Sequence, residues 1–143
     1  MTDELTIEDI IEEFDELTEW TDRCDYLIDL GFDLPELPEH VRTEENRVQG
    51  CQSNVWLISE IEQSDPPIIT LQAMSDSIIV SGLIVVLLAL YSGKTPVEII
   101  AIDPKSVFQK LGLDRFLSPQ RRNGLHGMVR RVRELAVKAE ALT

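Results

Sequence analysis

Cys51 lies in a segment whose residue types suit thiol chemistry. Gly50 before it favours a turn, and Gln52 and Ser53 after it are polar. A buried free cysteine behaves as a small hydrophobic residue, but a polar turn gives Cys51 no such packing role. The segment therefore predicts a reactive thiol at the tip of a loop.

The cysteine content limits what that thiol can do. The chain has 143 residues and two cysteines, Cys24 and Cys51, and we expect both to be reduced because a domain of this size does not need a disulfide. Cys24 shares an apolar helical stripe with Trp20 and Leu27, which predicts a packing role. Without a second cysteine near Cys51, a Cys-x-x-Cys oxidoreductase is excluded. Three single-thiol roles stay open: nucleophile, acceptor of a transferred group, or redox sensor.

Other kinds of chemical site find little support in the sequence. His40 and His126 share no metal-ligand spacing with each other or with the cysteines, so we expect no metal site. The run Gly93-Lys94-Thr95 resembles the end of a phosphate-binding loop, but the earlier glycine of that motif would fall at Leu88, inside a predicted helix. No Gly-x-Ser-x-Gly motif is present. We also expect no bound cofactor.

The N-terminal quarter of the chain predicts two helices and a loop. Thr6 is a candidate N-cap for a helix whose apolar face carries Ile7, Ile10, Ile11, Phe14 and Leu17. A second helix follows, and Gly31 is expected to end it in the left-handed conformation. The prolines in residues 33–39 then predict an irregular connection.

The rest of the chain predicts a hairpin followed by helices. Residues 54–61 and 68–74 indicate two antiparallel strands, and Ser75-Asp76 is expected to cap an apolar helix that ends near Tyr91, before Gly93. Further helix starts are predicted at Thr95-Pro96, Asp103-Pro104 and Ser118-Pro119, and the last helix has an apolar face at Leu125, Met128, Val129, Val132, Leu135 and Ala136. The expected fold is α+β, one domain over residues 1–143, with a small antiparallel sheet flanked by helices.

The net charge disfavours several classes of partner. The chain carries 26 acidic and 13 basic residues, a net charge of −13 and a pI near 4.4, which disfavours nucleic acid and anionic membrane surfaces. Up to Gln72 there are 20 acidic and 3 basic residues, net −17, whereas from Ala73 onward there are 6 and 10, net +4. This asymmetry suits orientation against a protein partner, although the bland alternative is solvated helix faces. The arginines concerned are Arg121, Arg122, Arg130, Arg131 and Arg133.

The sequence also predicts the compartment. The N-terminus is acidic where a secretory signal would be basic, and no apolar segment follows it. The charge-free run from Ser77 to Gly93 is too short to span a bilayer and indicates a buried core helix. We therefore expect a cytoplasmic protein.

Four separated motifs resemble those of one known family. Gly50-Cys51-Gln52-Ser53 with Val55-Trp56, preceded by Arg47-Val48, resembles the cysteine loop of the SufE family, the sulfur acceptors of cysteine desulfurases. The other matches, in the family's order and spacing, are Leu34-Pro35-Glu36-Leu37, Ser75-Asp76 leading into Ile79-Val80 and Gly82-Leu83, and Leu117-Ser118-Pro119 with Arg121 and Gly124-Leu125. Gln120, where the family often has serine, and Cys24, where an aromatic residue is expected, are departures outside the cysteine loop.

The resemblance implies a function and a fold. A pyridoxal-phosphate-dependent cysteine desulfurase, SufS-like or CsdA-like, would form a persulfide, and Cys51 would collect its sulfur and pass it to a SufB-containing scaffold for iron–sulfur cluster assembly. The family fold is shared with the IscU-type scaffolds. The chain would be an acceptor and activator rather than a free-standing enzyme. Gly50 would permit the loop to swing, with Gln52 and Ser53 as its polar neighbours.

Two further residues and two rival functions stay open at this point. Arg121, by resemblance, would hold the loop, support the thiolate or contact the desulfurase; the alternative is a structural salt bridge near a helix cap. For Asp76 the ordinary interpretation is a helix N-cap, and the functional alternative is a contact with the partner protein. The rivals are an iron–sulfur scaffold, which would need several cysteine ligands, and a single-cysteine peroxidase or thiol transferase.

Overall fold

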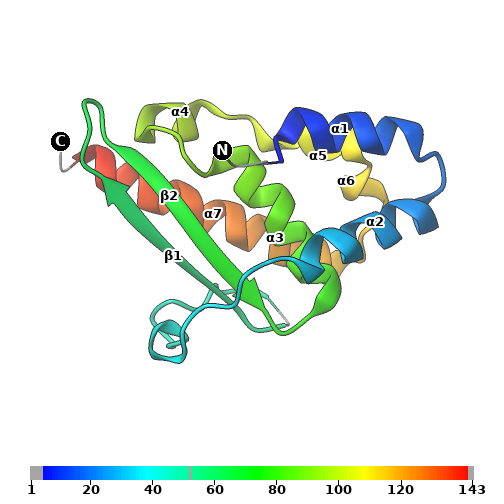
Figure 1. The fold of residues 1–143 in the computed structure, drawn as a ribbon, viewed down its shortest axis with the longest axis horizontal. Coiled ribbons are helices and arrows are strands. Elements are labelled where there is room, and N and C mark those ends of the chain that lie inside the picture. Colours follow the sequence, from blue (N-terminus) through cyan, green and yellow to red (C-terminus); the bar gives the residue numbers. More distant parts are fainter. Residues whose placement is uncertain (1–4, 52, 142–143) are drawn as a thin grey trace.

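The computed structural model describes residues 5–51 and 53–141, and this part of the chain forms an α+β fold (Figure 1). The predicted fold class is confirmed. The elements in chain order are α1 (Ile7–Glu16), α2 (Trp20–Phe32), the short 3-10 helix η1 (Glu39–Val41), β1 (Val55–Glu62), β2 (Ile68–Ser75), α3 (Ile78–Tyr91), α4 (Pro96–Ala101), α5 (Pro104–Leu111), α6 (Leu113–Phe116) and α7 (Pro119–Ala141).

The sheet is the predicted hairpin. Strands β1 and β2 pair antiparallel, with Val55 opposite Ser75 and Glu62 opposite Ile68. Alternate residues of β1, Val55 and Leu57, are buried, as expected of a sheet that covers a core with one face. In Figure 1 the hairpin lies in front of α7, while α1, α2, α5 and α6 gather at the opposite end of the molecule.

Helix α3 forms the centre of the core. It contains no charged residue, and side chains such as Leu83, Ile84 and Leu87 are at most 1% exposed. The charge-free run is thus a buried helix, as predicted. No helix in the described part of the chain combines the length and apolar character needed to cross a membrane.

Most predicted helix starts are confirmed by their caps. Thr6 and Asp9 form a capping box at α1, and Thr95 and Glu98 form one at α4. Asp103 accepts a hydrogen bond from the Lys105 amide at the start of α5. These caps depend on residues close in sequence, which is why local patterns located them.

Two predicted helix boundaries are wrong. Gly31 lies inside α2, because the helix continues one residue further while packed against α3; a Cβ on Gly31 would lie 2.7 Å from the Gly82 amide nitrogen. The glycine is thus used for close helix packing rather than for a left-handed stop. The N-cap of α3 is Ser77, whose hydroxyl accepts from the Val80 amide, and not Ser75-Asp76.

Candidate functional site

The Cys51 loop is a turn that backbone hydrogen bonds join to the start of β1. Arg47 forms a bridge with Trp56, and the Val48 amide donates to the Val55 carbonyl at 2.8 Å. Gly50 reverses the chain with a φ of +89°, a left-handed conformation that favours glycine, and a Cβ there would meet no atom within 4 Å. The loop therefore needs Gly50 for its backbone conformation and not for space.

The loop rests directly on α7. The Cys51 thiol lies 3.5 Å from the Gly124 carbonyl oxygen, to which it donates a weak hydrogen bond. A Cβ on Gly124 would approach Cys51 Sγ at 3.4 Å, and one on Gly127 would lie 2.6 Å from the Gln49 carbonyl oxygen. Two glycines one turn apart on α7 thus let the loop backbone lie against the helix.

A cavity of about 220 Å³ opens beside the Cys51 thiol. Its apolar wall is buried, since Leu83, Leu125 and Met128 are at most 3% exposed, whereas Gln120 and Arg121 are exposed. The lining residues are Cys51, Ser53, Val80, Leu83, Ser118, Gln120, Arg121, Gly124, Leu125 and Met128. The thiol therefore lies between an apolar interior and a polar rim.

Burial dominates the electrostatics of the thiol. Burial raises the pKa of Cys51 above its ordinary value, and the positive charge of Arg47 partly opposes this. Arg47 is itself held by Glu44, with Nε–Oε1 at 3.1 Å and Nη2–Oε2 at 3.0 Å. This ion pair holds the Arg47 guanidinium in place four residues before the thiol. Because the effect of burial is the larger one, the neutral form of the thiol is favoured while the loop lies against α7.

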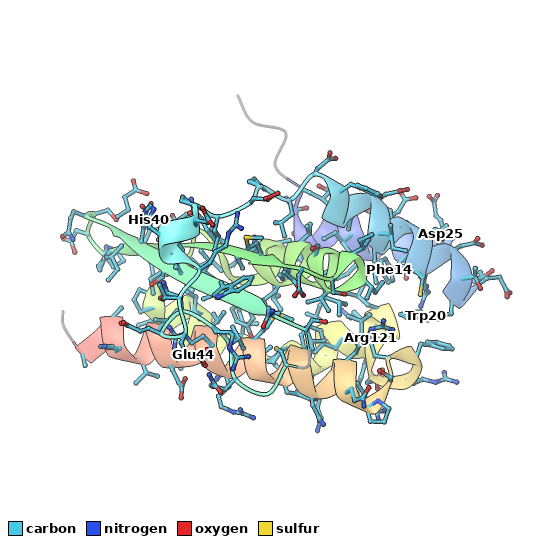
Figure 2. The ribbon with its side chains drawn as sticks, turned by 90° about the horizontal axis from the view of Figure 1, so that it is seen from below. Phe14, Trp20, Asp25, His40, Glu44 and Arg121 are labelled. Carbon is cyan, nitrogen blue, oxygen red and sulfur yellow. The ribbon has the colours of Figure 1, made fainter. Side chains whose placement is uncertain are left out.

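Arg121 lies near both cysteines. It lines the cavity beside Cys51, and its positive charge lowers the pKa of Cys24, which burial raises more strongly. Figure 2 shows Arg121 at the same end of the molecule as Trp20, which begins the helix that carries Cys24. Cys24 is a free, partly exposed thiol and is not one of the side chains that pack against the buried core, so the packing role predicted for it is not found.

Asp76 has a partner that the sequence did not predict. Its carboxylate accepts hydrogen bonds from the Asn54 backbone amide at 3.2 Å and from Asn54 Nδ2 at 3.0 Å. Asp76 thus ties the end of the cysteine loop to the segment between β2 and α3. Its predicted capping role is taken by Ser77.

The remaining predicted site residues divide by location. Ser53 lines the cavity, and Gly50 forms the turn before the thiol. Gln52 lies outside the described residues. Among the residues that are described, no three His, Cys, Asp or Glu side chains form a group able to hold a metal ion.

Three site features were missed by sequence reasoning. Gly124 and Gly127 stand in a long helix where glycine lowers helix stability by about 1 kcal/mol relative to alanine, a signal that the helix is approached closely. The sequence shows Arg47 four residues before Cys51, but it does not show that the Arg47 side chain acts on the thiol. The Asn54–Asp76 contact joins residues 22 positions apart, which no local pattern reveals.

Comparison with known proteins shows the family to which the chain belongs. Residues 8–136 match the sequence profile of SufE, described as the Fe-S metabolism associated domain. The chain belongs to the SufE family. Membership associates it with iron–sulfur metabolism and sulfur transfer.

Similar proteins extend over nearly the whole chain. An uncharacterised SufE-like protein of Rhizobium meliloti (strain 1021) is 46% identical over 132 residues, covering 92% of this chain and 94% of the relative. One from Rhizobium etli is 48% identical over 139 residues, covering 95% and 93%. The solution structure of a hypothetical protein from Thermus thermophilus matches this SufE fold with a TM-score of 0.74 at 22% identity, covering 94% and 96% of the two chains.

Proposed function

We propose that Cys51 accepts sulfur from the persulfide of a pyridoxal-phosphate-dependent cysteine desulfurase, SufS-like or CsdA-like, and relays it toward a SufB-containing scaffold. The chain acts in the cytoplasm as one domain, an acceptor and activator of its partner. The observation that carries the proposal is the position of the Cys51 thiol, at the tip of a glycine turn and beside a cavity, in a chain of the SufE family.

The transfer is a thiol exchange in which atoms and electrons balance. The Cys51 thiolate attacks the outer sulfur of the desulfurase persulfide, a new sulfur–sulfur bond forms on Cys51, and the old one breaks. The desulfurase cysteine leaves as a thiolate and takes up a proton from solvent. The oxidation level of the transferred sulfur is unchanged, so no external oxidant or reductant takes part.

The loop has two positions in this scheme. In the resting position the thiol lies against Gly124, where burial raises its pKa and keeps it protonated. In the transfer position the loop leaves α7 and the thiol reaches the partner's persulfide. Solvation then lowers the pKa toward its ordinary value, which raises the thiolate fraction when the partner is present.

The other site residues support the two positions. Gly50 is the hinge, and Asp76 holds the far end of the loop through Asn54. Arg47 stabilises the thiolate as it forms, while Arg121, exposed at the rim of the cavity, contacts the desulfurase. Ser53 lines the cavity beside Cys51 and supplies a polar group next to the thiol.

The cavity beside Cys51 can hold the persulfide once the loaded loop has moved back to α7. The cavity of about 220 Å³ beside Cys51 has room for one additional sulfur atom, which needs about the volume of a water molecule. Its buried wall of Leu83, Leu125 and Met128 screens the sulfane sulfur from water-soluble thiols and peroxides. The sulfur is therefore protected between its two transfers.

Neither rival function gains support from the site. A scaffold for an iron–sulfur cluster needs several cysteine ligands, and Cys51 has no other cysteine in its cavity lining. A single-cysteine peroxidase needs a lowered thiol pKa, whereas burial raises that of Cys51.

Stimulation of a desulfurase tests the proposal. A SufS-type enzyme supplied with L-cysteine and a reductant should release sulfide faster when the wild-type chain is added, and the Cys51→Ser variant should give no stimulation. Cys24→Ser is the matched control and should stimulate as the wild type does. Equal stimulation by the Cys51→Ser variant would contradict the proposal.

A further inference from the structure

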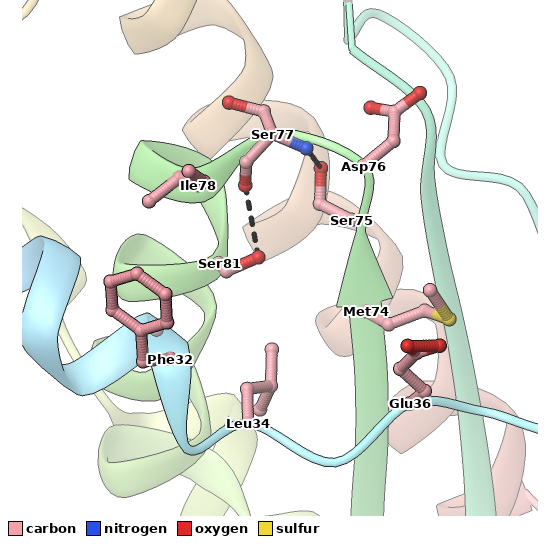
Figure 3. A pocket seen from close by; sticks show the side chains of 10 residues that line it. Phe32, Leu34, Glu36, Met74, Ser75, Asp76, Ser77, Ile78 and Ser81 are labelled. Atoms are coloured by element: carbon pink, nitrogen blue, oxygen red, sulfur yellow. Dashed lines mark hydrogen bonds between the residues drawn. The ribbon is translucent and has the colours of Figure 1, made fainter.

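A second hollow lies where the end of α2, the end of β2 and the start of α3 meet (Figure 3). Its volume is about 320 Å³, and its apolar surface includes Leu34 and Met74. Phe32 at the end of α2 is 72% exposed, and Ile78 at the start of α3 is 57% exposed. We call this surface the Phe32 hollow.

The walls of the Phe32 hollow are held in place from within. Ser81 Oγ donates to the Ser77 carbonyl at 2.9 Å, and the Ser77 amide donates to Ser75 Oγ at 3.1 Å. The Leu37 amide contacts Met74 Sδ at 3.2 Å. These hydroxyls and the thioether are thus engaged by the chain itself, while the apolar side chains of Phe32 and Ile78 stay exposed.

Two carboxylates border this surface. Figure 3 shows Glu36 beside Met74 and Asp76 beside Ser75. The Glu36 side chain is 75% exposed and meets Arg42 at 3.4 Å, a surface ion pair that a competing cation displaces at little cost. The rim therefore favours a positively charged group next to an apolar one.

The Phe32 hollow is connected to the cysteine loop. Asp76 lines the hollow and also accepts both hydrogen bonds from Asn54, three residues after Cys51. One residue thus belongs both to the rim of the hollow and to the contacts that hold the end of the cysteine loop, so a partner that receives the loop approaches this rim.

We propose that the Phe32 hollow is a docking surface for the cysteine desulfurase, which packs an apolar side chain between Phe32 and Ile78 and places a lysine or arginine against Glu36 and Asp76. This inference rests on the proposed function and adds the partner chemistry. In this proposal the hollow contributes to the binding of the desulfurase, and the cysteine loop carries out the sulfur transfer. Aromatic side chains such as Phe32 are enriched at the centres of protein interfaces, whereas polar and charged groups gather at the rim.

The test compares binding with sulfur loading. Phe32→Ser and Ile78→Ser each remove one exposed anchor, and Val97→Ser, 60% exposed on α4, is the matched control. The partner is the SufS-type desulfurase that loads sulfur onto the wild-type chain. We expect each anchor variant to raise the calorimetric Kd about tenfold or more and Val97→Ser to leave it unchanged. At saturating desulfurase, loading of Cys51 should return to the wild-type level.

A charge variant tests the rim independently. Glu36→Lys should raise the Kd a few-fold and reverse part of its salt dependence, because like charges now face each other. Thermal unfolding of every variant should match that of the wild type, since the changed side chains are exposed.

The possible failures are distinct. If the wild-type chain gains no sulfur, the proposed function fails. If the wild type is loaded but both anchor variants bind with its Kd, only the docking proposal is overturned. A free wild-type chain that sediments as a dimer, together with monomeric anchor variants of unchanged Kd, would assign the hollow to a second copy and also overturn it.

Discussion

Cys51 Sγ lies 3.5 Å from the carbonyl oxygen of Gly124, a residue 73 positions further along the chain. This contact joins the acidic first half of the sequence to the basic second half at the thiol. A Cβ on Gly124 would already touch the sulfur at 3.4 Å, so the thiol packs directly on the surface that this glycine leaves open. The resting state of the loop therefore depends on α7 as much as on the loop itself.

Enlarging the helix surface should release the loop. In Gly127→Ala, the new methyl group would lie 2.6 Å from the Gln49 carbonyl oxygen, so the loop must shift. We expect a loss of about 1–3 kcal/mol in the free energy of unfolding and faster alkylation of Cys51 at neutral pH. Urea denaturation and iodoacetamide kinetics measure the two effects. His126→Ala, an exposed change on the same helix, is the control; alkylation unchanged in Gly127→Ala would contradict the contact.

The cation that acts on Cys51 should be Arg47. Arg47→Gln removes the positive charge that opposes the effect of burial, so the pKa of Cys51 should rise further. The pH profile of Cys51 alkylation, followed by peptide mass spectrometry, should shift to higher pH. A shift to lower pH would show that Arg47 holds the loop closed rather than stabilising the thiolate.

Arg121 should act on the other thiol. Arg121→Ala removes the charge that lowers the pKa of Cys24, so the alkylation profile of Cys24 should move to higher pH. The profile of Cys51 should move less than it does in Arg47→Gln, and binding to the desulfurase should weaken. Arg121→Lys should restore much of the Cys24 profile. If Arg121→Ala changed neither thiol profile nor binding, Arg121 would have no part in the site.

Asp76 and Ser77 allow a comparison of two adjacent residues. Asp76→Ala removes both hydrogen bonds to Asn54, and Ser77→Ala removes the N-cap of α3; each should lower the free energy of unfolding by about 1 kcal/mol. Only Asp76→Ala should also speed amide hydrogen exchange at Ser53 and Asn54. Equal exchange in the two variants would contradict the tie between Asp76 and the loop.

Stability should fall on the alkaline side. In the folded state burial raises the pKa of Cys51, so the unfolded chain loses this proton first as the pH rises. The contribution is fully present below the unfolded thiol pKa, about 8.5, and decreases as the pH rises above it. Cys51→Ser should therefore flatten the decline in thermal stability above that pH, and a decline as steep as that of the wild type would contradict the burial effect.

Local patterns predicted much of this structure. The hairpin, the caps at Thr6, Thr95 and Asp103, and the Gly50 turn each follow from a few neighbouring residues. Gly31 was misinterpreted because its role depends on Ser81 and Gly82 of α3, which pack against it from a distant part of the sequence. The partners of Cys51 and Asp76 likewise lie in distant segments. Sequence reasoning therefore selected the cysteine for which we propose sulfur transfer and missed the helix surface that holds it.

The most direct test maps transferred sulfur. The wild-type chain, Cys24→Ser and Cys51→Ser are each incubated with a SufS-type desulfurase and L-cysteine, and peptides are analysed by mass spectrometry without reduction. We predict one or more added sulfur atoms on the Cys51 peptide of the wild type and of Cys24→Ser, and none on Cys51→Ser. An unmodified Cys51 in a wild-type chain that binds the loaded desulfurase, or sulfur carried by Cys24 instead, would contradict the relay.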